Sequence, residues 1–180
     1  GHSAVELVVV LAIFGLAAAI VSPAGRNLME RGRVRAAARD AASLLRRCRV
    51  QAALEGKHVA VVFGRDQDGW WYRPFRDGND NGVRLAETKS GVDPALGVAE
   101  PFAPRHHDVD LEILDQAKIP NVPPAAGLLG AGSPVRFGAS GIVSFSPLGS
   151  SSSGTLYLSH GFDHMAAVKL FGPTGRIRLW

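Results

Sequence analysis

Residues 1–25 read GHSAVELVVVLAIFGLAAAIVSPAG, in which Glu6 is the single carboxylate and the next charge is Arg26. The uncharged run from Leu7 to Gly25 is 19 residues long. At ~1.5 Å per residue, a helix of this length covers roughly the ~30 Å hydrocarbon core of a bilayer. Because a helix satisfies its own backbone in hydrocarbon, the run predicts a transmembrane helix. An acid at the edge of such a helix predicts a functional site with a cationic partner, from another copy of the chain, its α-amino group or another protein.

The order and spacing of Glu6, Gly15 and Pro23 resemble the N-terminal segment of type IV pilins and type II secretion pseudopilins. In that family a prepilin peptidase cleaves after a glycine that matches Gly1, so the resemblance implies a mature chain beginning at His2. His2 departs from the Phe that is usual there. A basic leader is expected before Gly1, so we interpret the chain as a processed or trimmed form. The resemblance further implies that Glu6 neutralises the α-amino group of an adjacent subunit, with Glu6 and Pro23 as assembly residues.

Bulk composition indicates one domain plus an anchor. The 180 residues include 20 Lys and Arg against 16 Asp and Glu, a mild basic excess that does not demand nucleic acid. The lone Cys48 excludes an intramolecular disulfide, so the domain must be stabilised by its core. The 21 glycines and 11 prolines favour a loop-rich β domain over a helical bundle.

A helical pattern resumes after Pro23, which is expected to kink the helix. Apolar residues recur at three- and four-residue steps and predict an amphipathic stem helix over residues 26–56, packed on the domain through Val34, Ala38, Ala41, Leu45, Cys48 and Ala52. Together with the first segment this predicts one long, bent helix from about Ser3 to about Glu55. The opposite face is basic, and it is either a solvated surface or a phosphate-binding surface for lipid head groups or nucleic acid; it carries Arg26, Arg31, Arg33, Arg35, Arg39, Arg46, Arg47 and Arg49.

Residues 57–180 predict a β-rich globular domain. Short β-branched or aromatic runs separated by turn residues indicate antiparallel strands laid on the stem helix. The expected strands are Lys57–Phe63, Trp70–Phe75, one around Val83–Ala86, Val109–Leu114, Val135–Phe137, Ile142–Phe145, Thr155–Leu158, Ala166–Phe171 and Arg176–Leu179. The predicted fold class is therefore α+β, with a long bent N-terminal helix, transmembrane in its first half (residues 1–25), packed on antiparallel sheets as in pilins.

This half of the chain resembles the GspH/FimT branch of the pseudopilins. The features that carry the likeness are, in order, Asp77–Gly82, Phe137–Gly149, Gly154–Thr155 and Gly175–Arg178. The resemblance implies a minor subunit of a secretion pseudopilus or type IV pilus, assembled from the bacterial inner membrane. It implies a single-pass protein with a periplasmic domain, which reaches the cell surface when assembled in a filament.

The C-terminal residues Gly175–Trp180 suggest a second function. In a strand, Arg176, Arg178 and Trp180 share one face, and two guanidinium groups beside an indole can neutralise phosphates and stack a base. FimT-like relatives that take up DNA use a Gly-Arg-x-Arg motif at this place, so the resemblance makes Arg176 and Arg178 DNA-contact candidates. In the alternative interpretation both arginines pair with carboxylates, within the domain or across a subunit contact.

Asp77, Asn79 and Asn81 have the alternate oxygen ligands of a calcium loop, with Gly82 at the turn. The twelfth position, where such a loop needs a bidentate Glu, is Thr88. We therefore expect a turn whose Asp and Asn side chains cap their own backbone, with a bound Ca²⁺ as the alternative. The histidine clusters at residues 106–108 and 160–164 do not show a third ligand at a fixed spacing.

The sequence thus predicts a minor pilin or pseudopilin, not an enzyme, with other such subunits, prepilin peptidase and the inner membrane as partners. The alternatives are a pilus-associated DNA receptor and the main subunit of a pilus-like filament. The sequence does not choose between secretion, pilus and competence systems.

Overall fold

The computed structural model describes residues 3–102, 108–114, 119–130, 132–138, 140–161 and 164–180, with backbone alone for residues 17–26. The chain divides into two compact units, Gly1–Gly32 and Arg33–Trp180. The first unit consists of helical turns. The second unit holds the rest of the helix and all the strands.

Helix α1 spans Ala4–Glu55, close to the predicted bounds. Ser3 begins it, because its carbonyl accepts bonds from the Glu6 and Leu7 amides, at 3.0 and 3.3 Å, and its hydroxyl accepts one from the Val5 amide. The helix ends where Gly56 adopts φ +65°, a left-handed conformation that glycine takes readily.

The membrane-spanning half of the fold prediction is wrong. Among the residues described, no helix is long and apolar enough to cross a membrane. The N-terminal turns with described side chains cover residues 4–16, and at ~1.5 Å per residue these are shorter than the ~30 Å of hydrocarbon. This finding also overturns the predicted localisation, a single-pass inner-membrane protein that reaches the cell surface in a filament. The α+β class and the antiparallel sheets are confirmed.

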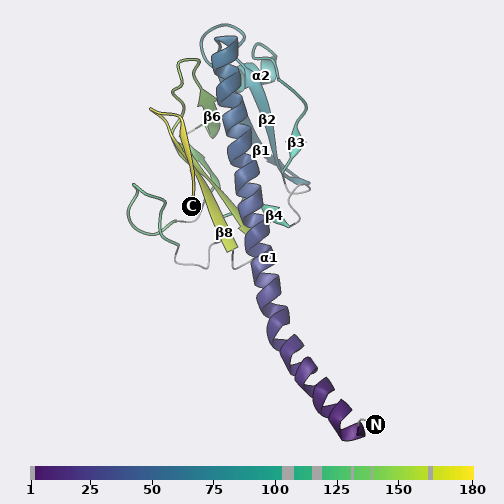
Figure 1. The fold of residues 1–180 in the computed structure, drawn as a ribbon. Helices are drawn as coiled ribbons and strands as arrows, with labels where there is room; N and C mark the ends of the chain where they lie inside the picture. Colours follow the sequence, from purple (N-terminus) through teal and green to yellow (C-terminus); the bar gives the residue numbers. More distant parts are fainter. Residues whose placement is uncertain (1–2, 103–107, 115–118, 131, 139, 162–163) are drawn as a thin grey trace. The chain divides into compact units, whose positions relative to one another are not determined.

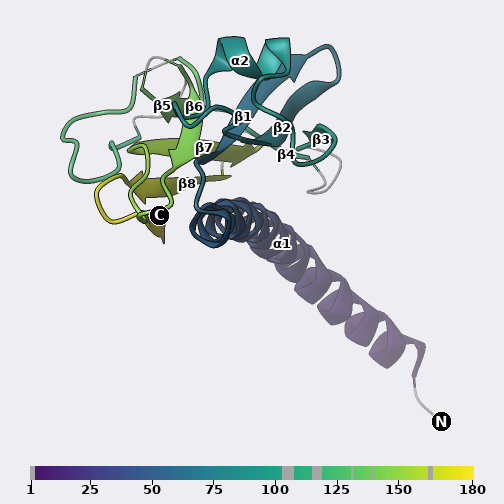
Figure 2. The same ribbon diagram turned by 90° about the horizontal axis from the view of Figure 1, so that it is seen from above.

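Two antiparallel sheets form the β part of the second unit (Figure 1). The first has the order β3-β2-β1-β6, made of Glu100–Pro101, Gly69–Arg76, Val59–Asp66 and Ile142–Phe145. The second has the order β4-β7-β8-β9, made of Val109–Asp110, Gly154–His160, His164–Phe171 and Arg176–Leu179, and β5 (Val135–Phe137) also pairs with β7. Within this unit both sheets lie on one side of α1 (Figure 2).

The core forms where the apolar stripe of α1 meets both sheets. Every residue predicted for that stripe is buried, and Leu45 and Ala52 have no exposed surface. They pack with buried residues from the first sheet (Val59, Val61, Val143, Phe145) and the second (Leu156, Leu158, Val168, Leu170). Alanines on the stripe allow the strands to approach the helix closely, and burying each large apolar side chain contributes ~1.5–3 kcal/mol.

The chain differs from the prediction after the second strand. The expected strand around Val83–Ala86 is replaced by a short helix, α2, at Leu85–Ser90, which ends at Gly91 with φ +83°. The Arg84 amide donates to Asp93 Oδ2 at 2.9 Å and not to a neighbouring strand. The expected strand Val109–Leu114 is shorter than predicted, since only Val109–Asp110 pair with β7.

Candidate functional site

The described N-terminal turns of α1 expose apolar side chains on all sides. Consecutive residues from Leu7 to Leu11 are exposed, and so are Phe14 at 69% and Leu16 at 70%. Five consecutive residues of a helix cover its whole circumference, because each turn holds 3.6 residues. A helix that is apolar all round is normally buried, and an apolar patch of this kind marks an interaction surface.

Glu6 lies in the first turn of α1, with an exposed side chain. A carboxylate there interacts favourably with the positive end of the helix dipole. Pro23 lies within α1, but its side chain is outside the described part of the chain, as are Gly1 and His2. The processing and assembly roles of these residues therefore stay predictions.

Sequence reasoning missed that cationic residues from separate strands form a row on the second sheet. The register pairs Arg136 with Thr155, Thr155 with Lys169, and Lys169 with Arg178. These four residues belong to β5, β7, β8 and β9 and lie side by side, at ~4.8 Å per strand. Arg176, two residues before Arg178, lies on the same face of β9 and pairs with Phe171. On this face Arg176 and Arg178 are exposed, Arg136 and Lys169 are half-buried and Thr155 between them is buried, while Ile177 packs against the core.

No carboxylate pairs with Lys169, Arg176 or Arg178 among the residues that the structure describes. Instead, the Arg178 guanidinium carbon lies 6.0 Å from the Phe171 ring centroid. The two arginines line a shallow groove of about 400 Å³ together with Phe171, Pro173 and Thr174. The alternative interpretation expected both arginines to pair with carboxylates, within the domain or across a subunit contact. Among the described residues neither arginine has such a partner within the domain.

The β8–β9 turn that presents this strand is held by α1. Arg49 Nη1 donates to the Gly175 carbonyl at 3.0 Å. Gly175 has φ +57°, and a Cβ there would lie 2.7 Å from the Gly149 carbonyl and 2.9 Å from Arg49 Nε. A side chain would not fit at position 175, because the Gly149 carbonyl and the Arg49 side chain lie too close. Arg49 thus helps to hold the turn that presents the two arginines.

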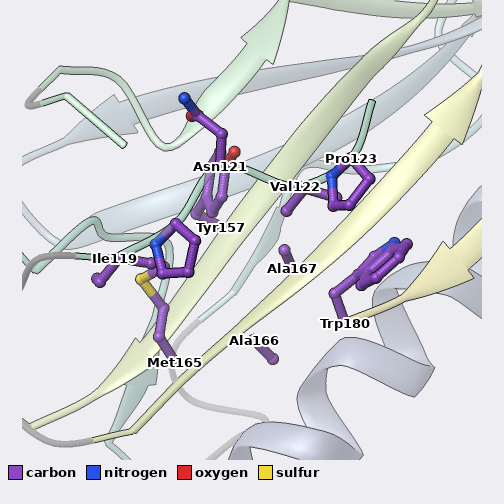
Figure 3. A pocket seen from close by; sticks show the side chains of 10 residues that line it. Ile119, Asn121, Val122, Pro123, Tyr157, Met165, Ala166, Ala167 and Trp180 are labelled. Carbon is purple, nitrogen blue, oxygen red and sulfur yellow. The ribbon is translucent and has the colours of Figure 1, made fainter. Parts of the chain in front are cut away.

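Trp180 lines a different cavity on the same sheet. Its backbone amide and carbonyl pair with Ala167 at 2.9 and 3.1 Å. The indole borders an apolar pocket of about 410 Å³ whose other walls include Tyr157, Met165, Val122 and Pro123 (Figure 3). A cavity of this size and character suits an apolar or aromatic group. Trp180 is thus placed to hold an apolar group beside the cationic row.

In the loop Asp77–Gly82 the Asp77 carboxylate caps its own backbone as predicted, whereas the Asn79 and Asn81 side chains bond to Glu87 and not to the backbone. Asp77 Oδ1 accepts from the Asn79 amide at 3.1 Å, and Oδ2 accepts from the Gly82 amide at 2.7 Å. Buried Asp93, which the sequence did not single out, accepts from the Gly78 amide at 3.0 Å. The Asn79 and Asn81 side-chain amides donate to the two oxygens of Glu87, at 3.2 and 3.0 Å. Of the oxygens considered for Ca²⁺, both carboxylate oxygens of Asp77 thus already accept bonds within the loop.

Burial and hydrogen bonding act in opposite directions on Asp77. Desolvation of this carboxyl raises its pKa, but bonds from the backbone amides of residues 79–82 lower the pKa by more in total. The pKa of Asp77 is therefore below its ordinary value. A carboxylate with this environment stabilises the folded loop as an anion.

The remaining candidates offer little chemistry. His160 and His164 face each other across the β7–β8 hairpin, while His106, His107 and Asp163 lie outside the described residues. The part of the chain that is described contains no group of three His, Cys, Asp or Glu suited to a metal.

The Cys48 thiol is buried. Burial raises its pKa to about 11, although Arg47 lowers the pKa in part, so this thiol is protonated and packed at neutral pH.

Comparison with protein-family models, with curated proteins and with solved structures gave no match to this chain.

Proposed function

We propose that the chain is a minor pilin or pseudopilin, a structural subunit that assembles into a filament through its N-terminal helix. The observation that carries this proposal is the exposure of apolar side chains on every side of α1 between Val5 and Leu16. The spacing of Glu6, Gly15 and Pro23 supports it independently. A role as the main subunit of such a filament would use the same surface.

The energetics favour association of these helices. Burying a large apolar side chain contributes ~1.5–3 kcal/mol, and association costs ~4–15 kcal/mol in lost freedom. Nine large apolar residues are exposed from Val5 to Leu16, so several of them buried against neighbouring copies offset that cost.

Glu6 sets the register of the packed helices in this proposal. Its carboxylate would pair with the α-amino group that prepilin peptidase creates on the next subunit. Within an apolar helix bundle an ion pair is worth little in net stability, but removing one partner leaves a buried charge, which costs about 3–5 kcal/mol.

The test is the entry of Glu6→Ala subunits into filaments. We expect a folded subunit, by circular dichroism, that is absent from sheared filaments. Asp40→Ala, which removes an exposed carboxylate from the stem of the same helix, serves as the control and should assemble normally. Glu6→Ala subunits present in filaments at the wild-type level would contradict the proposed role.

A second candidate function is DNA binding by the sheet surface. The observation in its favour is the row of Arg136, Lys169 and Arg178, with Arg176 beside it and no carboxylate on Lys169, Arg176 or Arg178 among the described residues. Binding to a duplex in a mobility-shift titration should fall steeply with salt. Arg176→Ala with Arg178→Ala should reduce the slope of log K against log[salt] by about 2, since each neutralised phosphate contributes about 0.9. Binding that is absent or insensitive to salt would exclude this candidate.

A further inference from the structure

The second sheet has two ends of opposite charge. Strand β9 is last in the order β4-β7-β8-β9, and β4 is first. We define the basic edge as Arg176–Leu179, which carries two arginines. We define the acidic edge as Asp108–Glu112, in which Asp108, Asp110 and Glu112 alternate with buried Val109 and Leu111.

The basic edge presents unpaired backbone. Ala167 and Trp180 exchange both backbone bonds, so in an antiparallel ladder Arg178 and Arg176 also form bonded pairs with β8. The N–H and C=O groups of Ile177 and Leu179 therefore point away from β8. Among the described residues none bonds to these outward groups. Such an edge accepts an extended segment as an additional strand.

Charges at this edge also exclude one mode of pairing. Two basic edges placed side by side would bring like charges opposite each other, which is destabilising. The edge is therefore protected against symmetric pairing with its own copy and selects an acidic strand. The acidic edge supplies one on the same face of the sheet, because Asp110 pairs with Ser159, on the outer face of β7, and Lys169 and Arg178 lie on that face too.

We infer that the basic edge of one copy binds the acidic edge of a second copy, so that the second sheet continues from subunit to subunit. Arg176 and Arg178 then lie beside Asp110 and Glu112 of the neighbour, and the Ile177 and Leu179 backbone bonds to its strand. Because the two surfaces differ, the contact is head-to-tail and not a two-fold symmetric dimer, and within the proposed filament it continues as an open chain. The inference rests on the proposed function, since it names a second contact within the same filament.

Charge reversal with mixing tests this contact on the full chain. The basic-edge variant is Arg176→Glu with Arg178→Glu. The acidic-edge variant is Asp110→Lys with Glu112→Lys, at the two carboxylates that this contact places beside the arginines. Each variant alone should self-associate about tenfold more weakly in sedimentation, because attractive cross-strand pairs become neutral or repulsive. An equimolar mixture should recover association, since each copy then meets a complementary edge.

The controls separate the outcomes. Arg46→Glu with Lys89→Glu makes the same change in net charge at exposed residues away from both edges and should associate as wild type. Wild-type association of the basic-edge variant would overturn the inference while leaving the Glu6 test of the helix unaffected. Loss in both variants without recovery on mixing would also overturn it.

Discussion

The two halves of α1 differ in how their apolar residues are arranged and in what surrounds those residues. From Val34 to Ala52 the apolar residues form one stripe, and the sheets of the same chain bury it. From Val5 to Leu16 they cover the whole circumference, and every one of them is exposed. A stripe can be satisfied by one neighbouring surface, whereas a helix that is apolar all round needs neighbours on several sides. The second half of the helix thus belongs to the fold of the second unit, whereas the first half is the surface that the proposed assembly would bury.

Leucine-to-alanine substitutions in the two halves give the largest expected contrast. Leu45→Ala removes a side chain with no exposed surface and should lower the free energy of unfolding by about 2–5 kcal/mol, because it leaves a cavity. Leu11→Ala, at a residue 61% exposed, should change it by less than about 0.5 kcal/mol. Denaturant unfolding followed by circular dichroism measures both. Equal effects on unfolding would show that the first half is already buried within the monomer.

The same contrast extends to assembly. Leu11→Ala should weaken self-association although it leaves folding intact, while Leu45→Ala should affect association only as far as it unfolds the subunit. A Leu11→Ala subunit that assembles as well as the wild type would remove Leu11 from the proposed interface.

Much of the fold could be predicted from local patterns. The stripe of α1 and its end at Gly56 follow from residue spacing, and β1, β2 and β5–β9 follow from β-branched and aromatic runs between turns. The membrane span was wrongly predicted from apolar length alone. The short helix α2 was not predicted, and the Arg84 amide that precedes it bonds to the Asp93 carboxylate and not to a neighbouring strand.

The candidate site was only half visible. Arg176 and Arg178 could be placed on one face, because alternation within a strand is local. Lys169 lies across the short turn at residues 172–175, so the hairpin could have placed it beside Arg178. Arg136 could not be placed, because β6 and the loops on either side of it separate β5 from β7 and no local pattern gives their register. Likewise, the sequence alone does not show that β4 and β9, which carry opposite charges, form the two ends of one sheet.

A smaller effect than at Leu45 is expected at Asp77, whose carboxylate accepts hydrogen bonds from backbone amides of its own loop. Its lowered pKa means that the anion is favoured in the folded state, so its contribution is present above the unfolded pKa of about 3.9. That contribution is lost as pH falls through the lower, folded pKa. Asp77→Asn replaces an acceptor with a donor that faces backbone amides, and should cost about 1–3 kcal/mol at pH 7.

The acid dependence identifies the cause of that cost. The difference in unfolding free energy between the wild type and Asp77→Asn should shrink as the wild-type carboxylate is protonated, so it is smaller at pH 2 than at pH 7. Asp68→Asn, at an exposed residue of the β1–β2 turn, is the matched control and should show little change at either pH. A difference for Asp77→Asn that stays constant with pH would mean that the loop depends on shape and not on its anion.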